Sequence, residues 1–267
     1  MQIKILYEDG NMVAIDKPSG LAVHGDGKTT EETLVDWILK KYPKMKSVGE
    51  PIISNGVEIA KPGIVHRLDR ETSGVLVLAK NQKTYEFLKN EFKGRTIKKI
   101  YIAIVDGWVK NDKGIINRPI GRSPRDFRRR LAGRGARGEM REAVTEYKVL
   151  RHFKAKTYQN FYPRGSRFEP KAPKEGRRGK NFGMSEHAPF TLLEIKPKTG
   201  RTHQIRVHMK FLNHPVACDE LYNPGKPCPA GFSRLALHAK SIEFTDMKGK
   251  KLLIESPLPK EFKKVIL

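Results

Sequence analysis

The chain has 267 residues, of which 38% are hydrophobic and 31% charged, so collagen-like, membrane-spanning and fully disordered classes are excluded. The length is enough for one large domain or two small ones, each with an ordinary hydrophobic core. Fifty-three Lys and Arg residues against 29 Asp and Glu give a net charge of +24, which favours nucleic acid as the partner over the alternative of a basic surface that binds nothing.

Hydrophobic periodicity and turn residues predict many short strands and a few helices. Two signals mark helix starts: Thr29 with Glu32 has the spacing of a capping box, and Asn81 is a preferred N-cap residue. The predicted elements, in chain order, are a strand pair in 2–16, a helix in 29–42, an irregular stretch in 43–62, a buried strand at 75–79, a helix after Asn81, a strand in 99–109, strands at 143–150 and 190–195, a helix from Thr202, and a strand pair at 242–245 and 252–255. Strands outnumber helices and hairpins outnumber strand–helix–strand units, so we expect an α+β fold with a largely antiparallel mixed central sheet and flanking helices.

Two strongly basic stretches interrupt the second half of the chain. Residues 118–141 include RRRLAGRGARGEMR and predict a hairpin with a glycine-rich tip. Residues 161–187 are rich in Pro, Gly, Lys and Arg and predict a mobile surface loop. No linker separates two self-sufficient cores, so we expect a single domain over 1–267 with basic insert loops at about 118–141 and 161–187.

The cysteine content and the first residues bear on the compartment. Cys218 and Cys228 are the only cysteines, so we expect no disulfide framework, a reducing compartment and packed or exposed thiols. Residues 1–10 alternate polar and apolar side chains and lack the features of a signal peptide, and no run of 18 apolar residues occurs. We therefore expect a cytoplasmic protein without membrane contact.

The sequence does not support any of the common nucleotide-binding, hydrolase or metal-binding motifs. The G-x-G-x-x-G spacing at 133–138 follows an arginine run and precedes a strand pattern, which is the wrong context for dinucleotide binding. It predicts instead a basic turn that contacts RNA or a solvated hairpin tip. Cys218, Cys228, His208 and His214 lack zinc-ligand spacing, and no P-loop, nucleophile-elbow serine or H-E-x-x-H helix occurs. We expect no metal and no nucleotide cofactor.

The segment HRLDRETSG (66–74) places an acidic side chain among basic ones. Asp69 lies between Arg67 and Arg70, and neighbouring positive charge keeps a carboxylate ionised, as a nucleophile or base requires. A structural aspartate in a surface ion-pair cluster fits the same residues and is the more common case. From these residues alone, both interpretations remain open.

A second basic cluster, KPKTGRTHQIRVH (196–208), combines a turn with the start of a helix. Gly200 closes the turn, and free N–H groups near Thr202 suit a phosphate. Thr202 and Arg206 lie four residues apart on one side of the helix, while Ile205 faces the core. Arg206 can therefore pair with a carboxylate from another segment; an amphipathic helix with solvated basic residues is the alternative.

Taken together, these segments resemble a known family. HRLDRETSG and GRTHQIRVHM, with KIYIAIVDG and RLALHA, are similar to motifs of the RluA-type family of RNA pseudouridine synthases, and the similarity runs in the family's order from Ile5 to Ala239. The resemblance implies the pseudouridine synthase fold, a catalytic cleft, and an enzyme that isomerises specific uridines in structured RNA, ribosomal or transfer, without a cofactor. Many relatives carry an N-terminal S4-like RNA-binding module, whereas this sequence starts at the catalytic-domain motif, so we expect the basic loops to supply RNA affinity.

The resemblance also implies roles for single residues. Asp69 matches the catalytic aspartate nucleophile, Tyr101 matches the tyrosine that packs on the target ring and assists proton removal from C5, and Arg206 matches the basic residue that pairs with the aspartate. Arg67 matches the arginine that helps to extrude the target nucleotide. The RNA-binding residues that we predict are His66, Arg67, Arg70, Arg201, Thr202, His203 and Leu237, the last in the base pocket.

Two other functions compete with this one. The first is a catalytically inactive RNA-binding or RNA-folding factor on the same scaffold, and the joint presence of Asp69, Tyr101 and Arg206 argues against it, because binding alone does not require them. The second is hydrolysis of a nucleotide base, which needs a positioned water and releases free uracil. We expect a monomeric enzyme whose partner is RNA.

Overall fold

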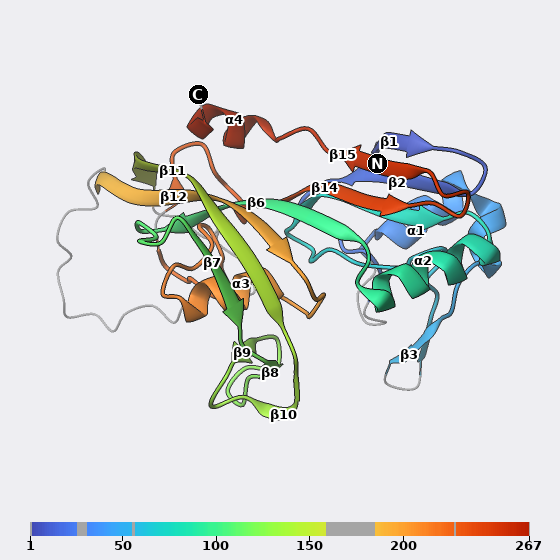
Figure 1. Ribbon diagram of the computed structural model, residues 1–267, viewed down its shortest axis with the longest axis horizontal. Helices are drawn as coiled ribbons and strands as arrows, with labels where there is room; N and C mark the ends of the chain where they lie inside the picture. The colour runs from blue at the N-terminus through green and yellow to red at the C-terminus, as the bar shows by residue number, and fades with distance from the viewer. Residues whose placement is uncertain (1, 26–30, 55–56, 159–184, 227, 267) are drawn as a thin grey trace.

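The computed structural model describes residues 2–25, 31–54, 57–158, 185–226 and 228–266. A ten-stranded sheet runs through the molecule, with helices packed along it (Figure 1). The predicted α+β class is therefore confirmed.

Strands make up most of the regular structure. They are β1 (Lys4–Glu8), β2 (Met12–Lys17), β3 (Ile52–Ser54), β4 (Val57–Ile59), β5 (Ser73–Ala79), β6 (Lys98–Asp106), β7 (Lys113–Asn117), β8 (Ile120–Arg122), β9 (Arg130–Ala132), β10 (Arg137–Arg141), β11 (Val144–Tyr158), β12 (Ser185–Pro197), β13 (Cys228–Pro229), β14 (Leu237–Thr245) and β15 (Lys251–Glu255). The helices are α1 (Leu34–Lys41), the 3-10 helix η1 (Pro43–Ser47), α2 (Gln82–Gly94), α3 (Gln204–Phe211) and α4 (Lys260–Ile266).

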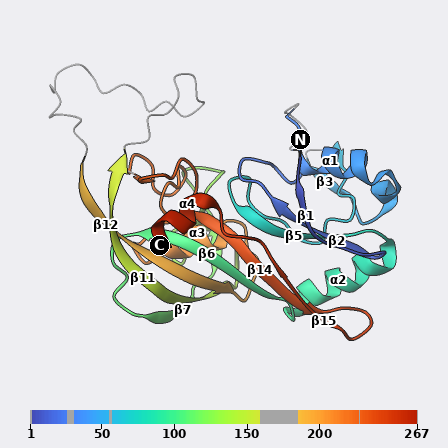
Figure 2. The same ribbon diagram turned by 90° about the horizontal axis from the view of Figure 1, so that it is seen from above.

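The large sheet has the order β1-β2-β5-β14-β6-β12-β11-β13, with β15 paired to β14 and β7 to β11. Among the described strand pairs, only β5 with β14 is parallel, which confirms the largely antiparallel sheet. α1 and α2 cover the half that contains β2 and β5, and α3 and α4 cover the half that contains β6 and β12 (Figure 2). Each half buries its own cluster of apolar side chains, the first and the second core, and β14 and β6 join them.

The helix starts agree with the sequence in one case and differ in the other. Asn81 caps α2, because its side chain accepts a 2.9 Å hydrogen bond from the N–H of Thr84. α1 begins later than predicted: the carboxylate of Asp36 accepts 2.7 Å hydrogen bonds from both the N–H and the hydroxyl of Thr33. Thr33 and Asp36 have the same spacing as the pair we predicted, and Thr33 directly precedes Leu34, the first buried residue of the helix. Thr29 lies outside the described residues.

Three stretches have more regular structure than the sequence predicts. The region 43–62 contains η1 and the β3–β4 pair. The strand predicted at 143–150 extends to Tyr158, and its partner β12 starts at Ser185, so that His187 lies in a strand and not in a loop. The rest of the predicted 161–187 loop lies outside the described residues.

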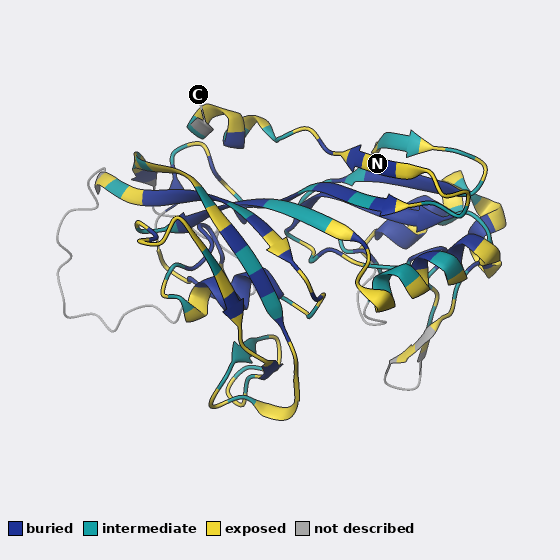
Figure 3. Ribbon diagram, viewed as in Figure 1, coloured by how far each residue is buried: buried dark blue, intermediate teal, exposed yellow. Residues whose placement is uncertain are grey.

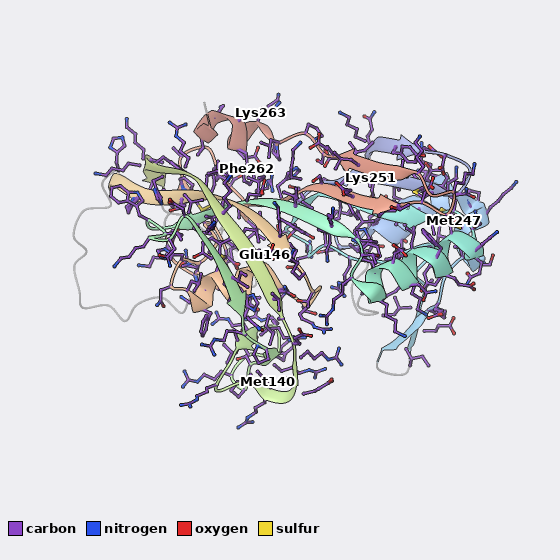
Figure 4. The ribbon with its side chains drawn as sticks, viewed as in Figure 1. Met140, Glu146, Met247, Lys251, Phe262 and Lys263 are labelled. Carbon is purple, nitrogen blue, oxygen red and sulfur yellow. A yellow bond between two sulfur atoms is a disulfide. The ribbon has the colours of Figure 1, made fainter. Side chains whose placement is uncertain are left out.

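Residues 118–141, here called the basic insert, form a small three-stranded sheet and not a single hairpin. β8 lies in the middle, between β10 and β9. The sheet projects from the ends of β7 and β11 (Figure 1), and every residue of β10 is exposed (Figure 3). Met140, labelled in Figure 4, marks the strand at the end of this projection.

The expectation of two separate thiols is wrong, because Cys218 and Cys228 form a disulfide. Cys218 follows an antiparallel bridge between Val105 and Val216, and Cys228 opens β13 on the edge of β11. Both segments converge on the second core, which brings the Cα atoms to 5.2 Å, within the usual range for a disulfide. The sequence spacing alone does not indicate that the intervening loop returns to its start.

Gly74, at the end of HRLDRETSG, is required by the parallel β5–β14 contact. Its φ is +115°, and a Cβ there would lie 2.7 Å from the backbone nitrogen of Ala239 and closer still to its carbonyl oxygen. We expect Gly74→Ala to lower the free energy of unfolding by about 2–4 kcal/mol, because it adds a clash to an unfavourable φ. Urea denaturation measures this. Gly10→Ala, where a Cβ meets nothing within 4 Å, is the control, and equal stabilities for the two variants would contradict the assignment.

Candidate active site

A cavity of about 510 Å³ lies where the two cores meet. Its walls come from the 65–72 loop, α2, β6, the 197–203 turn, α3 and the first residue of β14. Tyr101 on β6 packs against both cores and lines the cavity together with Leu237. Nine of the ten predicted site residues line it, and the exception is Arg70.

Asp69 and Arg206, which are 137 positions apart in the sequence, face each other in this cavity. Nη1 of Arg206 lies 3.4 Å from Oδ2 of Asp69. Only 8% of the Arg206 side chain and 18% of the Asp69 side chain are exposed. The predicted carboxylate–guanidinium pair is therefore present in the geometry, with Arg206 on a buried face of α3.

A second carboxylate holds the other side of the same guanidinium. Asp219 accepts hydrogen bonds from Nε and Nη2 of Arg206 at 2.7 and 2.8 Å, and its side chain is fully buried. Such a two-point contact fixes the plane of an arginine. Burial opposes the charge of Arg206, but the hydrogen bonds and charge of Asp219, with the charge of Asp69, outweigh it, so its pKa lies above the ordinary value. The cation that faces Asp69 is permanent.

Asp219 was missed by the sequence analysis, and it is also fixed locally. Its Oδ1 accepts the backbone N–H groups of Leu221 and Tyr222 at 3.0 and 2.9 Å. An Asp that bonds to backbone two and three residues later is common in turns, and this local pattern is the signal that the sequence offers. It does not indicate that an arginine on another segment is the second partner.

Tyr101 presents a neutral phenol to the cavity. Burial, and after it the charge of Asp69, raise the pKa of Tyr101 well above its ordinary value. β6 pairs with β12 on one side and β14 on the other, so that Tyr101 lies opposite Ile195 and Ala239. Its position is therefore set by the middle of the sheet.

His66 and Arg67 share a segment but have different surroundings. Nε2 of His66 accepts the N–H of Val77 at 2.9 Å, and its ring stacks on Phe92 with centroids 4.5 Å apart. Burial, with a smaller effect from a nearby lysine, lowers the pKa of His66 to about 3, so the ring is neutral. Arg67 is exposed on the cavity wall, where its Nη1 lies 3.2 Å from Nε2 of His24. His66 is placed to support the loop, and Arg67 is placed to contact a ligand.

Arg70 points away from the cavity. Its guanidinium pairs with Glu31 at 2.8 Å and donates to the carbonyl of Gly20 at 3.0 Å. Its backbone carbonyl instead accepts a 3.0 Å hydrogen bond from the buried ammonium of Lys17, which also donates to the carbonyls of Pro18 and Leu21. Burial lowers the pKa of Lys17 to about 7. Lys17, which the sequence analysis missed, thus ties the loop that carries Asp69 to the end of β2.

The turn before α3 brings three more predicted residues to the cavity. Arg201 donates from Nε to the carbonyl of Glu142 at 2.9 Å, Thr202 is exposed at the rim, and His203 adopts a left-handed conformation with φ of 57°. α3 therefore begins at Gln204, two residues later than predicted. The Gln204 side chain closes the turn, since its Oε1 accepts the N–H of Arg201 at 2.9 Å and the hydroxyl of Thr199 at 2.7 Å.

No group of three His, Cys, Asp or Glu side chains within the described ranges is arranged to hold a metal ion. In the same part of the chain, no helix is long and apolar enough to cross a bilayer.

Comparison with known proteins agrees with this geometry. The family model described as RNA pseudouridylate synthase matches residues 11–211. An uncharacterized RNA pseudouridine synthase of Bacillus subtilis (strain 168) is 33% identical over 100% of this chain and 72% of its own length. An uncharacterized RNA pseudouridine synthase of Aquifex aeolicus is 38% identical over 82% of this chain and 56% of its own length.

A named relative supports the same assignment, and a solved structure shows the same fold. Ribosomal large subunit pseudouridine synthase D of Borreliella burgdorferi is 35% identical, over 97% of this chain and 66% of that relative. The chain thus spans between 56% and 72% of the length of these three relatives. The structure of human RNA pseudouridylate synthase domain containing 1 has the same fold, with a TM-score of 0.68 and 22% identity over 97% of this chain and 84% of that one. The chain belongs to the RNA pseudouridylate synthase family, and the RluA-type resemblance of its motifs is confirmed.

Proposed function

We propose that this protein isomerises uridines in structured RNA to pseudouridine. The observation that carries the proposal is the 3.4 Å approach of Arg206 Nη1 to Asp69 Oδ2 inside a cavity that also contains Tyr101 and Leu237. A binding module without catalysis has no need for a carboxylate that is held by a buried arginine, because burying such a pair is costly. Family membership and this arrangement both favour catalysis.

The proposed reaction rearranges one base and consumes no second substrate. The carboxylate of Asp69 attacks C1′ of the ribose as the bond between C1′ and N1 of uracil breaks, and the base then rotates within the cavity. C5 attacks C1′ and displaces the carboxylate, which regenerates Asp69, and the proton on C5 leaves to solvent while N1 gains one. Atoms balance without a cofactor. The guanidinium of Arg206, with its Nη1 3.4 Å from Oδ2 of Asp69, holds the carboxylate in place in the cavity.

Three residues are placed to act on the target base or on the space that it leaves in the RNA. Tyr101 and Leu237 offer an aromatic ring and an apolar side chain against which a pyrimidine can pack. Arg67, exposed at the cavity wall, is placed to fill the space that the base leaves in the RNA stack. Extruding a base costs a few kcal/mol, and a planar guanidinium can replace part of the lost stacking.

The basic insert is the proposed RNA-binding surface. Phe127 at its surface is 86% exposed, and an exposed aromatic ring among arginines can stack on an unpaired base. The insert is connected to the cavity, because the N–H of Arg130 donates to the hydroxyl of Tyr222 at 2.8 Å and Tyr222 in turn bonds to His203. RNA on the insert therefore lies beside the residues that surround Asp69.

Ribosomal RNA is the first substrate to test, and transfer RNA the second, because several relatives are named for the large ribosomal subunit. The experiment maps pseudouridine chemically across cellular RNA from strains with and without the gene, and across the same RNA treated with the purified protein. We expect a position that reacts only when the protein is present. Binding of RNA with no such position would support the inactive RNA-binding factor, and release of free uracil would support base hydrolysis.

RNA affinity should depend steeply on salt, because Lys and Arg contacts to phosphates release counterions. We expect log K to fall linearly with log[salt], with a slope of about −0.7 per phosphate contacted on single-stranded RNA. Arg134→Gln with Arg137→Gln, two exposed residues of the basic insert, should make the slope shallower by about 0.7 for each phosphate that is no longer neutralised. Lys44→Gln with Lys46→Gln, also exposed but on η1, removes the same amount of charge and should change the slope little. Equal changes of the slope in the two double variants would contradict RNA binding by the basic insert.

A further inference from the structure

His203 lies between the proposed nucleophile and a buried tyrosine. Its Nε2 is 3.9 Å from Oδ1 of Asp69, and its Nδ1 is 2.9 Å from the hydroxyl of Tyr222. The two rings are nearly perpendicular, at 83°, with centroids 5.6 Å apart. Asp69 is therefore approached from two sides, by Arg206 at Oδ2 and by His203 at Oδ1.

The contacts of Tyr222 and the charge of Asp69 together indicate which nitrogen of His203 carries the proton. The hydroxyl oxygen of Tyr222 accepts the backbone N–H of Arg130 at 2.8 Å, so its own hydrogen is free to donate to Nδ1 of His203. Nε2 then carries the hydrogen and points it toward the Asp69 carboxylate. The other tautomer would direct a lone pair of Nε2 at a negative charge, which is electrostatically unfavourable.

The backbone of His203 indicates that this placement is maintained at a cost. With φ of 57° and ψ of 19°, His203 is one of four described non-glycine residues at positive φ. A left-handed conformation is unfavourable for an ordinary residue, because its Cβ lies too close to the following carbonyl oxygen. Strain of this kind concentrates at functional sites, where the surrounding structure enforces it. Here it directs the imidazole between Tyr222 and Asp69.

We infer that His203 is a positioning residue, which orients the Asp69 carboxylate for attack through its Nε2–H, and that Tyr222 fixes the tautomer that makes this possible. The inference rests on the proposed function. The 3.9 Å separation is longer than a hydrogen bond, and catalytic hydrogen bonds of this kind often tighten when substrate is bound. Because Tyr222 also accepts from the backbone of Arg130, the basic insert and the carboxylate are joined through two side chains.

The test compares four variants in single-turnover release of tritium from C5 of uridine in RNA, with the protein in saturating excess. His203→Ala should lower the rate about 10- to 100-fold, as removal of an orienting partner does at other sites. RNA affinity, measured by filter binding, should change less than about twofold, because in this inference the residue acts on Asp69 and not on RNA, unlike the RNA-binding role predicted from the sequence. His203→Gln places an amide N–H near the position of Nε2 and should restore most of the rate. Thermal unfolding checks that each variant is folded.

Tyr222 supplies the second half of the test. Tyr222→Phe keeps the ring, whose centroid lies 5.1 Å from the Arg206 guanidinium, and removes only the hydroxyl, so we expect a slower rate at unchanged affinity. If the hydroxyl acts through His203, the double variant Tyr222→Phe/His203→Ala is no slower than His203→Ala alone. If the rate losses of the two single variants multiply in the double variant, Tyr222 acts by another route, such as its bond to Arg130, and the inference is overturned.

Failure of this inference and failure of the proposed function look different. An active wild-type protein whose rate is unaffected by His203→Ala, or lowered equally by Ala and Gln, overturns the positioning role and leaves the function standing. The positioning role also fails if RNA affinity falls as much as the rate, since His203 would then bind RNA directly. A wild-type protein that releases no tritium from any RNA overturns the function and this inference together.

Discussion

Arg206→Met is expected to abolish pseudouridine formation and to lower the free energy of unfolding by about 3–5 kcal/mol. The loss of activity follows because the cation at 3.4 Å from Asp69 disappears. The loss of stability follows because Asp219, whose side chain is fully buried, loses both of its charge-assisted hydrogen bonds to the guanidinium. Urea denaturation measures the stability, and tritium release measures the activity.

Three controls separate the two effects. Arg141→Met removes an ion pair with Glu139 whose side chains are 60% and 71% exposed, and it should leave the free energy of unfolding almost unchanged, because exposed ion pairs contribute little. Arg206→Lys keeps a positive charge but cannot contact Asp219 at two points, so it should recover only part of the stability. Combining Arg206→Met with Asp219→Asn removes the uncompensated buried charge and should recover stability without activity. An Arg206→Met protein as stable as the wild type would contradict the described pairing.

The sequence was informative where short-range rules decide the structure. Alternating apolar residues placed β1 and β6, short apolar runs placed β2 and β5, and Asn81 marked the start of α2. The sequence was misleading where two neighbouring segments carry the same signal for a helix start. Thr33 with Asp36 has the same spacing as Thr29 with Glu32, and tertiary contacts of the buried face that begins at Leu34 decide between them. The three-stranded form of the basic insert and the disulfide depend on contacts between distant segments, which no local rule describes.

The candidate site shows the same difference between local patterns, which the sequence reveals, and long-range contacts, which it does not. The motifs that contain Asp69 and Arg206 stand out as basic clusters, and their pairing was predicted through the family resemblance. Asp219 did not stand out, because an acidic residue in a turn is ordinary until the fold brings Arg206 to it. Tyr222 and Lys17 were missed for the same reason, since a buried hydroxyl or ammonium is defined by partners far away in the sequence. Arg70, beside Asp69 in sequence, turns away toward Glu31.

The second large effect is expected from Asp69→Asn, which should lower the rate of pseudouridine formation by about 10⁴-fold or more, because a neutral amide cannot act as the nucleophile. The protein should remain folded, since Arg206 keeps both hydrogen bonds to Asp219 at 2.7 and 2.8 Å. RNA affinity should also remain, because the basic insert and the other residues of the cavity wall are untouched. Urea denaturation and filter binding check these two points.

Tritium release from C5-labelled uridine in the substrate RNA, compared between the wild-type protein and Asp69→Asn, addresses the nucleophile most directly. Label that appears in solvent with the wild type, and stays in the RNA with the folded, RNA-binding variant, is the result we predict. Equal release by both proteins would place the chemistry on another group and remove the carboxylate from its central role.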